Sequence, residues 1–375
     1  MRICVAGAGL AGSLLAWRLA ERPGIRVDLL AGYGRGMDAT SVSGGAVRGY
    51  DALARQRELA IASLAELLAS PVLRRWGGYQ QTGFVYLPGD HGGLADAMAQ
   101  LARHLPGSAM LTTAGAAFAD DVATGPDAGP AWSGREDAPA VVERLAGSIV
   151  PGRLRDAVLA DLAGRDDVTV DDAPLDAVRL PEAGPARVTS PAGVREYDRV
   201  VLAAGAWTPS LLRASGLPAR EYRTKIISYS VCPVSGWCPP PFADDATGLY
   251  GKPAAGGGLV LGVPTAGWDV PPGRPPADPR WQERARELAA ALFPRLRLGP
   301  ARTTVTAVDC YCDPPVLSLR PVPVDRPGLY TFTGGSGGAA KTALAASARA
   351  AAELADPGDN IGPADTSRIP GAVRR

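Results

Sequence analysis

Three lysines stand among thirty-six arginines in this chain, and each lies in a glycine-rich or extended segment. They are Lys225 in EYRTKIISYS, Lys252 in LYGKPAAGGG and Lys341 in TGGSGGAAKTALAAS. A lysine offers a compact, movable charge whose pKa shifts on burial, which the guanidinium of Arg does not provide. In a chain that takes nearly all its cations from Arg, these lysines predict contacts with a bound cofactor or an anionic substrate. The alternative is that they are solvated and have no role.

A glycine motif follows the first apolar run, in the sequence VAGAGLAG. Residues 13–20 then predict a helix and residues 25–30 a second strand, which is the context that a dinucleotide fingerprint requires. Gly7 permits the tight turn, Gly9 lets the backbone approach a pyrophosphate, and Gly12 lets the helix pack closely on the strand. The helix N-terminus adds partial positive charge for the phosphates. The motif therefore predicts FAD or NAD(P).

The acid that usually holds the adenosine ribose is absent. It is expected about 20 residues after the glycines, where the second strand ends. That position falls on Ala31, and Asp28 lies inside the strand, where we expect it to point away. Ribose contacts are therefore expected from water or from neighbours such as Arg35.

Length and composition exclude several classes of protein. A chain of 375 residues holds two modest domains or one elaborate one, and its net charge of +1 shows no basic face for nucleic acid. No apolar run approaches the ~18 residues that a membrane span needs, and the N-terminus reads as a strand, not a signal peptide. Five cysteines without a disulfide framework or a Cys/His cluster fit a reducing compartment and no metal site. We expect a cytoplasmic monomer or homodimer.

Hydrophobic periodicity predicts further helices and strands. Residues 106–140 are expected to form surface turns and residues 168–197 a small hairpin layer. The helices are expected at 52–70, 94–105, 153–164 and 341–354, and the strands at 79–87, 198–204 and 329–333.

Three segments occur in a recognisable order: VAGAGLAG, then YDRVVLAAGAWTPSLL at 197–212, then PGLYTFTGGSGGAAKTALAASARAAAELA at 327–355. So arranged, they resemble the FAD-dependent D-amino acid oxidase superfamily, and most of all its branch of sarcosine and N-methyl amino acid oxidases. The resemblance implies a mixed α/β (α+β) fold with a Rossmann-like FAD-binding domain and an antiparallel-sheet substrate domain. The FAD-binding domain is expected from 1–50, 145–212 and 325–375, and the substrate-binding domain from 51–144 and 213–324.

Within this resemblance, the small residues of AAGAW let the sheet end pass close to the flavin. The glycines of GGSGG place bare N–H groups at a strand-to-helix corner, which favours negative charge on the reduced flavin. The residues expected to contact FAD are Gly7, Gly9, Leu10, Ala11, Gly12, Ala31, Arg35, Ser43, Gly44, Gly45, Ala204, Gly205, Trp207, Gly335, Ser336, Gly337, Gly338 and Lys341.

The superfamily's carboxylate-binding arginine falls on Arg48 in SGGAVRGYD, and its lysine partner on Lys341, although Ala339 replaces the second glycine of the pattern Ser-Gly-x-Gly-x-Lys. An arginine fork and a lysine ammonium would orient a substrate carboxylate as well as bind it. A surface salt bridge is the alternative for Arg48. A cation opposes the dipole at a helix N-terminus, which favours a functional role for Lys341. Tyr250 matches a tyrosine that this branch directs at the substrate, with core packing as the alternative.

The chain departs from this branch at the lysine that promotes reaction with oxygen. In the strand GLVLG this position is Val260. Because a positive charge stabilises superoxide, either Lys225 or Lys252 replaces the lost lysine, or the protein passes electrons to another acceptor. The two histidines, His91 and His104, lie in an expected surface region, so we expect no histidine-based acid–base chemistry.

Cys310 in CYCDPP lies where this branch often carries a cysteine joined covalently to the flavin. Covalent attachment through Cys310 is one alternative, and non-covalent FAD is the other. Cys232 and Cys238 are expected to be inert thiols rather than a redox pair.

These residues together predict an FAD-dependent oxidase. It would oxidise the C–N bond of a carboxylate-bearing amino acid or amine to an imine, by hydride transfer to flavin N5. Arg48 and Lys341 would bind the substrate, with Lys225, Lys252 and Tyr250 as catalytic candidates. The alternatives are an FAD-dependent dehydrogenase or a tailoring oxidase of a cyclic imine or carrier-bound amino acid, a flavin-binding subunit without its own activity, and an NAD-dependent dehydrogenase.

Overall fold

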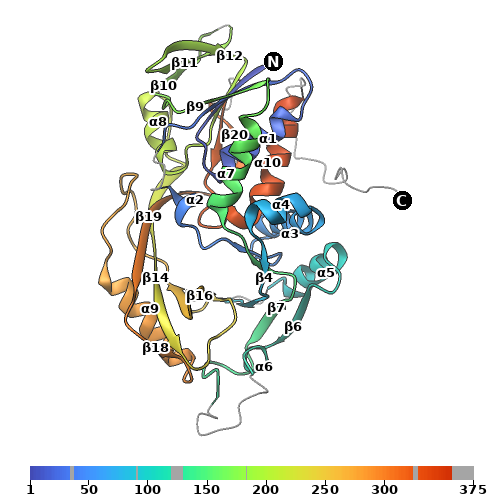
Figure 1. The fold of residues 1–375 in the computed structure, drawn as a ribbon, viewed down its shortest axis with the longest axis vertical. Coiled ribbons are helices and arrows are strands. Elements are labelled where there is room, and N and C mark those ends of the chain that lie inside the picture. The colour runs from blue at the N-terminus through green and yellow to red at the C-terminus, as the bar shows by residue number, and fades with distance from the viewer. Residues whose placement is uncertain (34–37, 90–91, 120–129, 183, 324–327, 357–375) are drawn as a thin grey trace.

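The computed structural model describes residues 1–375 except 34–37, 90–91, 120–129, 183, 324–327 and 357–375 (Figure 1). The molecule is elongated. A six-stranded sheet with its helices lies at one end, and a larger, mainly antiparallel sheet lies at the other. The predicted mixed α/β fold is confirmed.

The six-stranded sheet has the order β20-β21-β13-β1-β2-β9. All neighbouring strands are parallel except β20 and β21. Its strands are β1 (Arg2–Ala6), β2 (Arg26–Leu30), β9 (Val168–Asp171), β13 (Arg199–Leu202), β20 (Ser318–Pro321) and β21 (Leu329–Thr333). The predicted domain division stays a proposal. Strand β20 belongs to this sheet although it precedes residue 325, where the last part of the FAD-binding domain was expected to begin.

Both faces of this sheet are covered, as parallel sheets require. Alternate residues of a strand face opposite sides. Accordingly, Ile3 and Val5 pack among the helices α1 (Leu10–Ala20), α7 (Pro151–Leu162) and α10 (Ala339–Ala355). Cys4 and Ala6 pack on the other side, against α8 (Thr208–Ala214) and a small antiparallel sheet. That sheet consists of β10 (Ala177–Arg179), β11 (Ala186–Ser190) and β12 (Gly193–Tyr197).

The larger sheet is built around β14 (Tyr222–Ser235), which pairs antiparallel with β19 (Thr303–Cys312) over ten residue pairs. On its other side the order continues β17-β16-β15-β5-β7-β6, antiparallel except for the parallel pair of β15 and β5. The remaining strands are β5 (Phe84–Leu87), β6 (Ala109–Thr113), β7 (Pro139–Glu143), β15 (Phe242–Asp244), β16 (Tyr250–Ala254), β17 (Gly258–Gly262) and β18 (Arg297–Leu298).

Helix α9 (Pro279–Leu292) packs on this sheet. Phe118, Trp132, Phe242 and Phe293 form an aromatic cluster in the same core as the buried side of α9. A second small sheet has the strand order β3-β8-β4. The remaining elements are α2 (Ala39–Val42), β3 (Ala46–Val47), α3 (Ala54–Ala69), α4 (Pro71–Gly77), β4 (Gln80–Gln81), α5 (Leu94–His104), α6 (Ala114–Ala117), β8 (Gly147–Ser148) and the short 3-10 helix Gly205–Trp207.

The four helices predicted from periodicity are present, with ends shifted by at most two residues, and β21 spans the predicted 329–333. The helix predicted at 13–20 is α1, which begins three residues earlier, at Leu10. Three expectations are wrong. The strand expected at 79–87 divides into β4 and β5, because Gly83 turns the chain at φ 68°. Residues 106–140 contain β6, α6 and the start of β7, and β6 was not predicted because it is an edge strand with little burial. Strand β9 joins the six-stranded sheet instead of the hairpin layer.

Among the described residues, none of the helices combines the length and the apolar character needed to cross a membrane.

Candidate active site

A cavity of about 1060 Å³ lies between the two large sheets. It runs from the carboxyl ends of β1, β13 and β21, where ligands of open α/β sheets bind, to the inner face of β14 and β16. The predicted site residues that line it are Gly7, Gly9, Leu10, Ala11, Ala31, Ser43, Gly44, Gly45, Arg48, Ala204, Gly205, Trp207, Lys225, Tyr250, Lys252, Gly335, Gly337, Gly338 and Lys341.

Four predicted residues are not brought to this cavity by the described structure. Arg35 lies outside the described residues. The Ser336 hydroxyl donates to the Gly334 carbonyl. A Cβ at Gly12 would lie 1.9 Å from the Gly7 carbonyl oxygen, so Gly12 is needed for packing and not for cofactor contact. The fourth, Cys310, is considered separately below.

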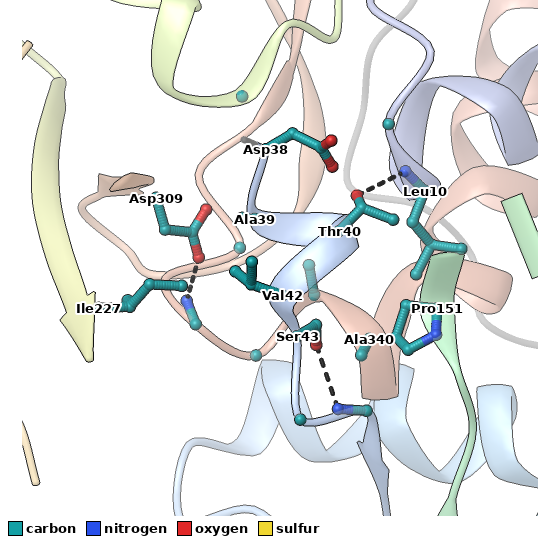
Figure 2. A pocket seen from close by; sticks show the side chains of 18 of the residues that line it. Leu10, Asp38, Ala39, Thr40, Val42, Ser43, Pro151, Ile227, Asp309 and Ala340 are labelled. Carbon is teal, nitrogen blue, oxygen red and sulfur yellow. Dashed lines mark hydrogen bonds between the residues drawn. The ribbon is translucent and has the colours of Figure 1, made fainter. Parts of the chain in front are cut away.

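The nucleotide loop leaves room for a ligand at one position. Gly7 adopts φ 117°, and a Cβ there would lie 2.4 Å from the Ala203 carbonyl oxygen. Gly9 is extended, and its Cβ would meet only the Thr40 hydroxyl, at 3.3 Å. That hydroxyl accepts a hydrogen bond from the Leu10 amide at 3.0 Å (Figure 2). The open space above Gly9 fits the approach of a pyrophosphate, and Thr40 on the short helix α2 is a neighbour that the sequence did not reveal.

The strand-to-helix corner differs from its prediction. The Gly337 amide donates to the Asp309 carboxylate at 3.0 Å, and the Ser336 and Gly338 amides donate to the carbonyls of Cys310 and Gly335. The expectation of bare N–H groups is therefore wrong for Gly337 and Gly338. Asp309 lines the cavity on the far side of α2 from Leu10 (Figure 2), and burial raises the pKa of its carboxyl group.

All three lysines line the same cavity. Lys252 is the cross-strand neighbour of Val260, and its ammonium donates to the Gly44 carbonyl. The Lys225 ammonium lies 4.6 Å from the ring centre of Trp268 and 5.4 Å from that of Tyr311. Burial lowers the pKa of both ammonium groups. The two lysines predicted to replace the lost charge thus approach the cavity from β14 and β16, the two strands that flank β17.

Tyr250 also lines the cavity, but its hydroxyl donates to the Ser228 carbonyl at 3.1 Å. Burial raises the pKa of this hydroxyl to about 12. Tyr250 is therefore a neutral group near neutral pH and does not act as a base.

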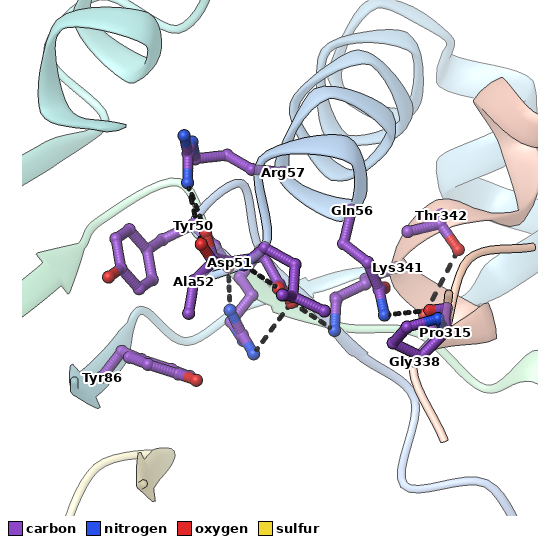
Figure 3. Close-up of polar contacts among 12 residues, drawn as sticks. Tyr50, Asp51, Ala52, Gln56, Arg57, Tyr86, Pro315, Gly338, Lys341 and Thr342 are labelled. Atoms are coloured by element: carbon purple, nitrogen blue, oxygen red, sulfur yellow. Dashed lines mark hydrogen bonds and ion pairs between the residues drawn. The ribbon is translucent and has the colours of Figure 1, made fainter. Parts of the chain in front are cut away.

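The expected carboxylate clamp contains a residue that the sequence analysis missed. Asp51 lies 2.9 Å from the Lys341 ammonium and 3.9 Å from the Arg48 guanidinium (Figure 3). Arg48 also donates to the Tyr50 carbonyl and lies 4.4 Å from the ring centre of Tyr86. Although burial alone raises the pKa of Asp51, the charges of Lys341 and Arg48 hold it below its ordinary value. The two cations are brought together as predicted, but they are not free.

The structure does not bring Cys310 to the cavity. Alternate residues of β19 face opposite sides: Asp309 and Tyr311 line the cavity, whereas Cys310 is 1% exposed in the core on the other side. Burial raises the pKa of its thiol to about 12. Because the thiolate is the reactive form, covalent attachment through Cys310 does not fit this geometry.

We therefore expect acid precipitation of the purified protein to leave the flavin in the supernatant and a colourless pellet. Cys310→Ser should behave identically, because the thiol faces the core. Absorbance of the two fractions measures the result. A yellow pellet from the wild-type protein and a colourless pellet from Cys310→Ser would instead support covalent attachment of the flavin through Cys310.

A parallel sheet that ends in a glycine nucleotide loop, beside a large cavity, is typical of a dinucleotide-binding protein. The family model described as FAD dependent oxidoreductase (DAO) matches residues 2–354, and the chain belongs to this family. It is an enzyme, and its cofactor is FAD. The predicted superfamily is confirmed, while the closer likeness to the sarcosine oxidase branch stays a prediction.

Solved structures with the same fold include glycine oxidase from Geobacillus kaustophilus, with a TM-score of 0.71, 18% identity and 94% of each chain covered. L-proline dehydrogenase from P. horikoshii has a TM-score of 0.69 at 18% identity, covering 94% of this chain and 92% of the other. Iminodiacetate oxidase from Chelativorans sp. BNC1 has a TM-score of 0.66 at 18% identity, covering 96% and 97%. A search of curated protein sequences gives no match.

Proposed function

We propose that this enzyme oxidises the C–N bond of an amino acid or amine to an imine, in the cavity between its two large sheets. The observation that carries this proposal is the single cavity, which connects the nucleotide loop at Gly9 with Arg48, Lys341 and Tyr250. The similar structures, by their names, act on glycine, L-proline and iminodiacetate, all of which contain an amine beside a carboxyl-bearing carbon. We also propose a cytoplasmic location.

The FAD site would be formed by the nucleotide loop, the segment Ala204–Trp207 and the corner at Gly335–Gly338. Bound FAD supplies a two-electron acceptor for the hydride that leaves the carbon beside the nitrogen. Gly9 leaves the backbone open to the pyrophosphate, and the first turn of α1 adds the partial positive charge of a helix N-terminus.

The residues of the chain set the protonation of the amine. Lys225 and Lys252 line the cavity, and positive charge there raises the cost of an ammonium form of the substrate. The neutral amine is the form whose lone pair assists loss of hydride. His104 is not among the residues that line the cavity, and His91 lies outside the described residues, so no histidine is assigned to remove this proton.

The proposal is tested by anaerobic addition of glycine, N-methylglycine, proline and their amides to the purified yellow protein. We expect at least one of them to bleach the flavin absorbance and to yield the corresponding imine or its hydrolysis product. A flavin that stays oxidised with every amine, while dithionite still reduces it, would support instead a flavin-binding subunit without its own active site.

We further propose that Lys252 takes the place of the oxygen-activating lysine lost at Val260, because the two residues are cross-strand neighbours. Side chains in such a pair lie on the same face, about 5 Å apart at Cβ. Lys252→Met should therefore slow reoxidation of the reduced enzyme by O₂ about ten-fold or more, because an anionic oxygen species loses its nearby cation. Stopped-flow mixing with O₂ measures this rate.

Lys225→Met is the matched variant, since Lys225 lies beside Trp268 and not beside Val260. An enzyme that reacts slowly with O₂ even as wild type would point to the dehydrogenase alternative and another acceptor. Fast reoxidation in both variants would show that neither lysine serves oxygen.

A further inference from the structure

Lys225 brings a positive charge to the cavity from a different element than Arg48 and Lys341. Its side chain lies on the face of β14 that lines the cavity. The described residues offer its ammonium neither an ion-pair partner nor a hydrogen-bond acceptor, and burial is accordingly the only cause that lowers its pKa. The charge of Lys225 is therefore not neutralised by the described part of the chain.

Two aromatic rings set the position of this ammonium. It lies 4.6 Å from the ring centre of Trp268 and 5.4 Å from that of Tyr311, and the two rings meet edge to face with their centres 5.2 Å apart. Aromatic rings attract a cation through their quadrupole but do not neutralise its charge. The rings thus hold Lys225 in place while its charge stays available to an anion.

Two acids that border Lys225 in the sheet are engaged elsewhere. Asp309 is its cross-strand partner on β19, but the Asp309 carboxylate accepts hydrogen bonds from two backbone amides, at 2.8 and 3.0 Å. Asp269 pairs with Arg223 at 2.6 Å. Neither acid contributes to the shift in the pKa of Lys225.

The other positive centre of the cavity is the group formed by Arg48, Lys341 and Asp51. Two cations against one carboxylate leave this group with a net positive charge, which suits the free carboxylate of an amino acid. A substrate with one carboxylate neutralises only this centre. A second anionic group on the same substrate would neutralise Lys225 as well.

Tyr311 connects the two positive centres. Its ring lies 5.4 Å from the Lys225 ammonium, and a Cβ at Gly337 would lie 3.1 Å from its hydroxyl oxygen. A Cβ at the next residue, Gly338, would lie 2.9 Å from the Lys341 ammonium. Because consecutive Cα atoms are only about 3.8 Å apart, a single substrate that lies along Tyr311 can reach both ammonium groups.

We propose that Lys225 binds a second carboxylate of the substrate, so that the enzyme oxidises an amine with two carboxylates in preference to one with a single carboxylate. The one charge of an ammonium matches the one charge of a carboxylate. The guanidinium that could help to hold a phosphate, that of Arg223, is already paired with Asp269. This inference rests on the proposed amine oxidation, and it makes Lys225 a specificity-determining residue that contacts the substrate away from the oxidised carbon.

The first test uses the unmodified holoenzyme and pairs of compounds that differ in one charge. The amines are iminodiacetate with its monoamide, and both enantiomers of glutamate with those of glutamine. The unreactive probes are succinate, glutarate and adipate with their monoamides. Anaerobic flavin reduction gives the affinity for the amines, and flavin difference spectra give it for the probes.

We expect at least one diacid in each set to bind about ten-fold or more tightly than its monoamide, because only the diacid meets Lys225 with a charge. The length of the preferred diacid measures the separation of the two positive centres. The preference should become smaller as salt is added. Binding of every monoamide as tightly as its diacid would overturn the proposal.

Lys225→Gln removes the charge and keeps a polar side chain, so it should bind diacids and monoamides nearly equally. Arg223→Gln is the matched control. Arg223 lies two residues earlier on β14 and 4.7 Å from the same Trp268 ring, but it is not among the residues that line the cavity. It should leave the diacid-to-monoamide ratio unchanged. A ratio that stays as in wild type in Lys225→Gln, or that falls equally in both variants, would refute the role of Lys225.

A thermal measurement separates this inference from the reaction itself. The preferred diacid probe should raise the melting temperature of the wild-type protein more than its monoamide does, and this advantage should disappear in Lys225→Gln. If no amine reduces the flavin, the proposed function fails, and the thermal comparison still decides the inference. If amines with one carboxylate reduce the flavin and no diacid is preferred, the proposed function stands and the inference fails. If the variant does not fold, the wild-type comparisons decide it alone.

Discussion

Gly9→Val should give a folded protein that no longer carries flavin. Gly9 has φ −69° and an extended conformation, which valine adopts readily, and only the Thr40 hydroxyl lies near its Cβ position, at 3.3 Å. The fold therefore tolerates the side chain with a small adjustment of Thr40. The valine methyl groups would instead fill the space through which the backbone meets the pyrophosphate. Absorbance of the purified protein measures the flavin, and circular dichroism measures the fold.

Gly12→Val is the matched comparison on the same loop. Its Cβ would lie 1.9 Å from the Gly7 carbonyl oxygen and 3.0 Å from the Ala203 Cβ, so the helix cannot approach the sheet. This variant should lose the fold as well as the flavin. Full flavin content in folded Gly9→Val would show that the cofactor does not approach the loop at Gly9.

Lys341→Met should destabilise the protein by about 3–5 kcal/mol near neutral pH, because it leaves the buried carboxylate of Asp51 without its close partner. The side chains of Lys341 and Asp51 are 12% and 11% exposed, so water can compensate little. Arg48 remains, but at 3.9 Å from the carboxylate. Urea denaturation of the two proteins measures the free energy of unfolding.

The pH dependence of this difference has a definite sign. In the wild type the pKa of Asp51 lies below its ordinary 3.8. The stability that the pair provides is therefore fully present above that value and is lost as the pH falls through the folded-state pKa. In Lys341→Met only Arg48 and the Leu53 amide still oppose the effect of burial, so the pKa of Asp51 rises, and protonation on acidification relieves the unpaired charge. The difference in the free energy of unfolding between wild type and Lys341→Met should accordingly become smaller as the pH is lowered from 7 toward 4.

The double variant Lys341→Met with Asp51→Asn is the control, since replacing both partners of a buried pair by neutral groups is often tolerated. It should recover most of the lost stability. If Lys341→Met alone is as stable as wild type at pH 7, Asp51 is hydrated or neutral in the folded protein.

Local sequence patterns predicted the first strand–helix–strand unit, the helices and the final strand, because each is a regular element with a strong apolar period. The glycine motif and the three lysines pointed correctly to a common cavity. The side of β19 on which the Cys310 side chain lies was not predicted. Successive residues of a strand face opposite sides, so an error of one residue places a side chain in the cavity when it lies in the core.

Asp51 was missed for another reason. Its spacing of three residues from Arg48 is visible in AVRGYD, but its partner Lys341 is almost three hundred residues away in the sequence. Pairing of that kind depends on the packing of α10 against α3, which no local period reveals. Strand β6 was missed because an exposed edge strand needs no apolar alternation.

The order of strands in the six-stranded sheet has a consequence for biosynthesis. Strand β1 is paired on one side with β2 but on the other with β13, which in turn pairs with β21, and α1 packs against α10. An emerging N-terminal segment therefore has one open edge until residues 199–202 are made, and the helix of its nucleotide loop has no final packing partner until residues 339–355 leave the ribosome. Because so many contacts join distant segments, we expect flavin to be bound only after residues 339–355 have been made.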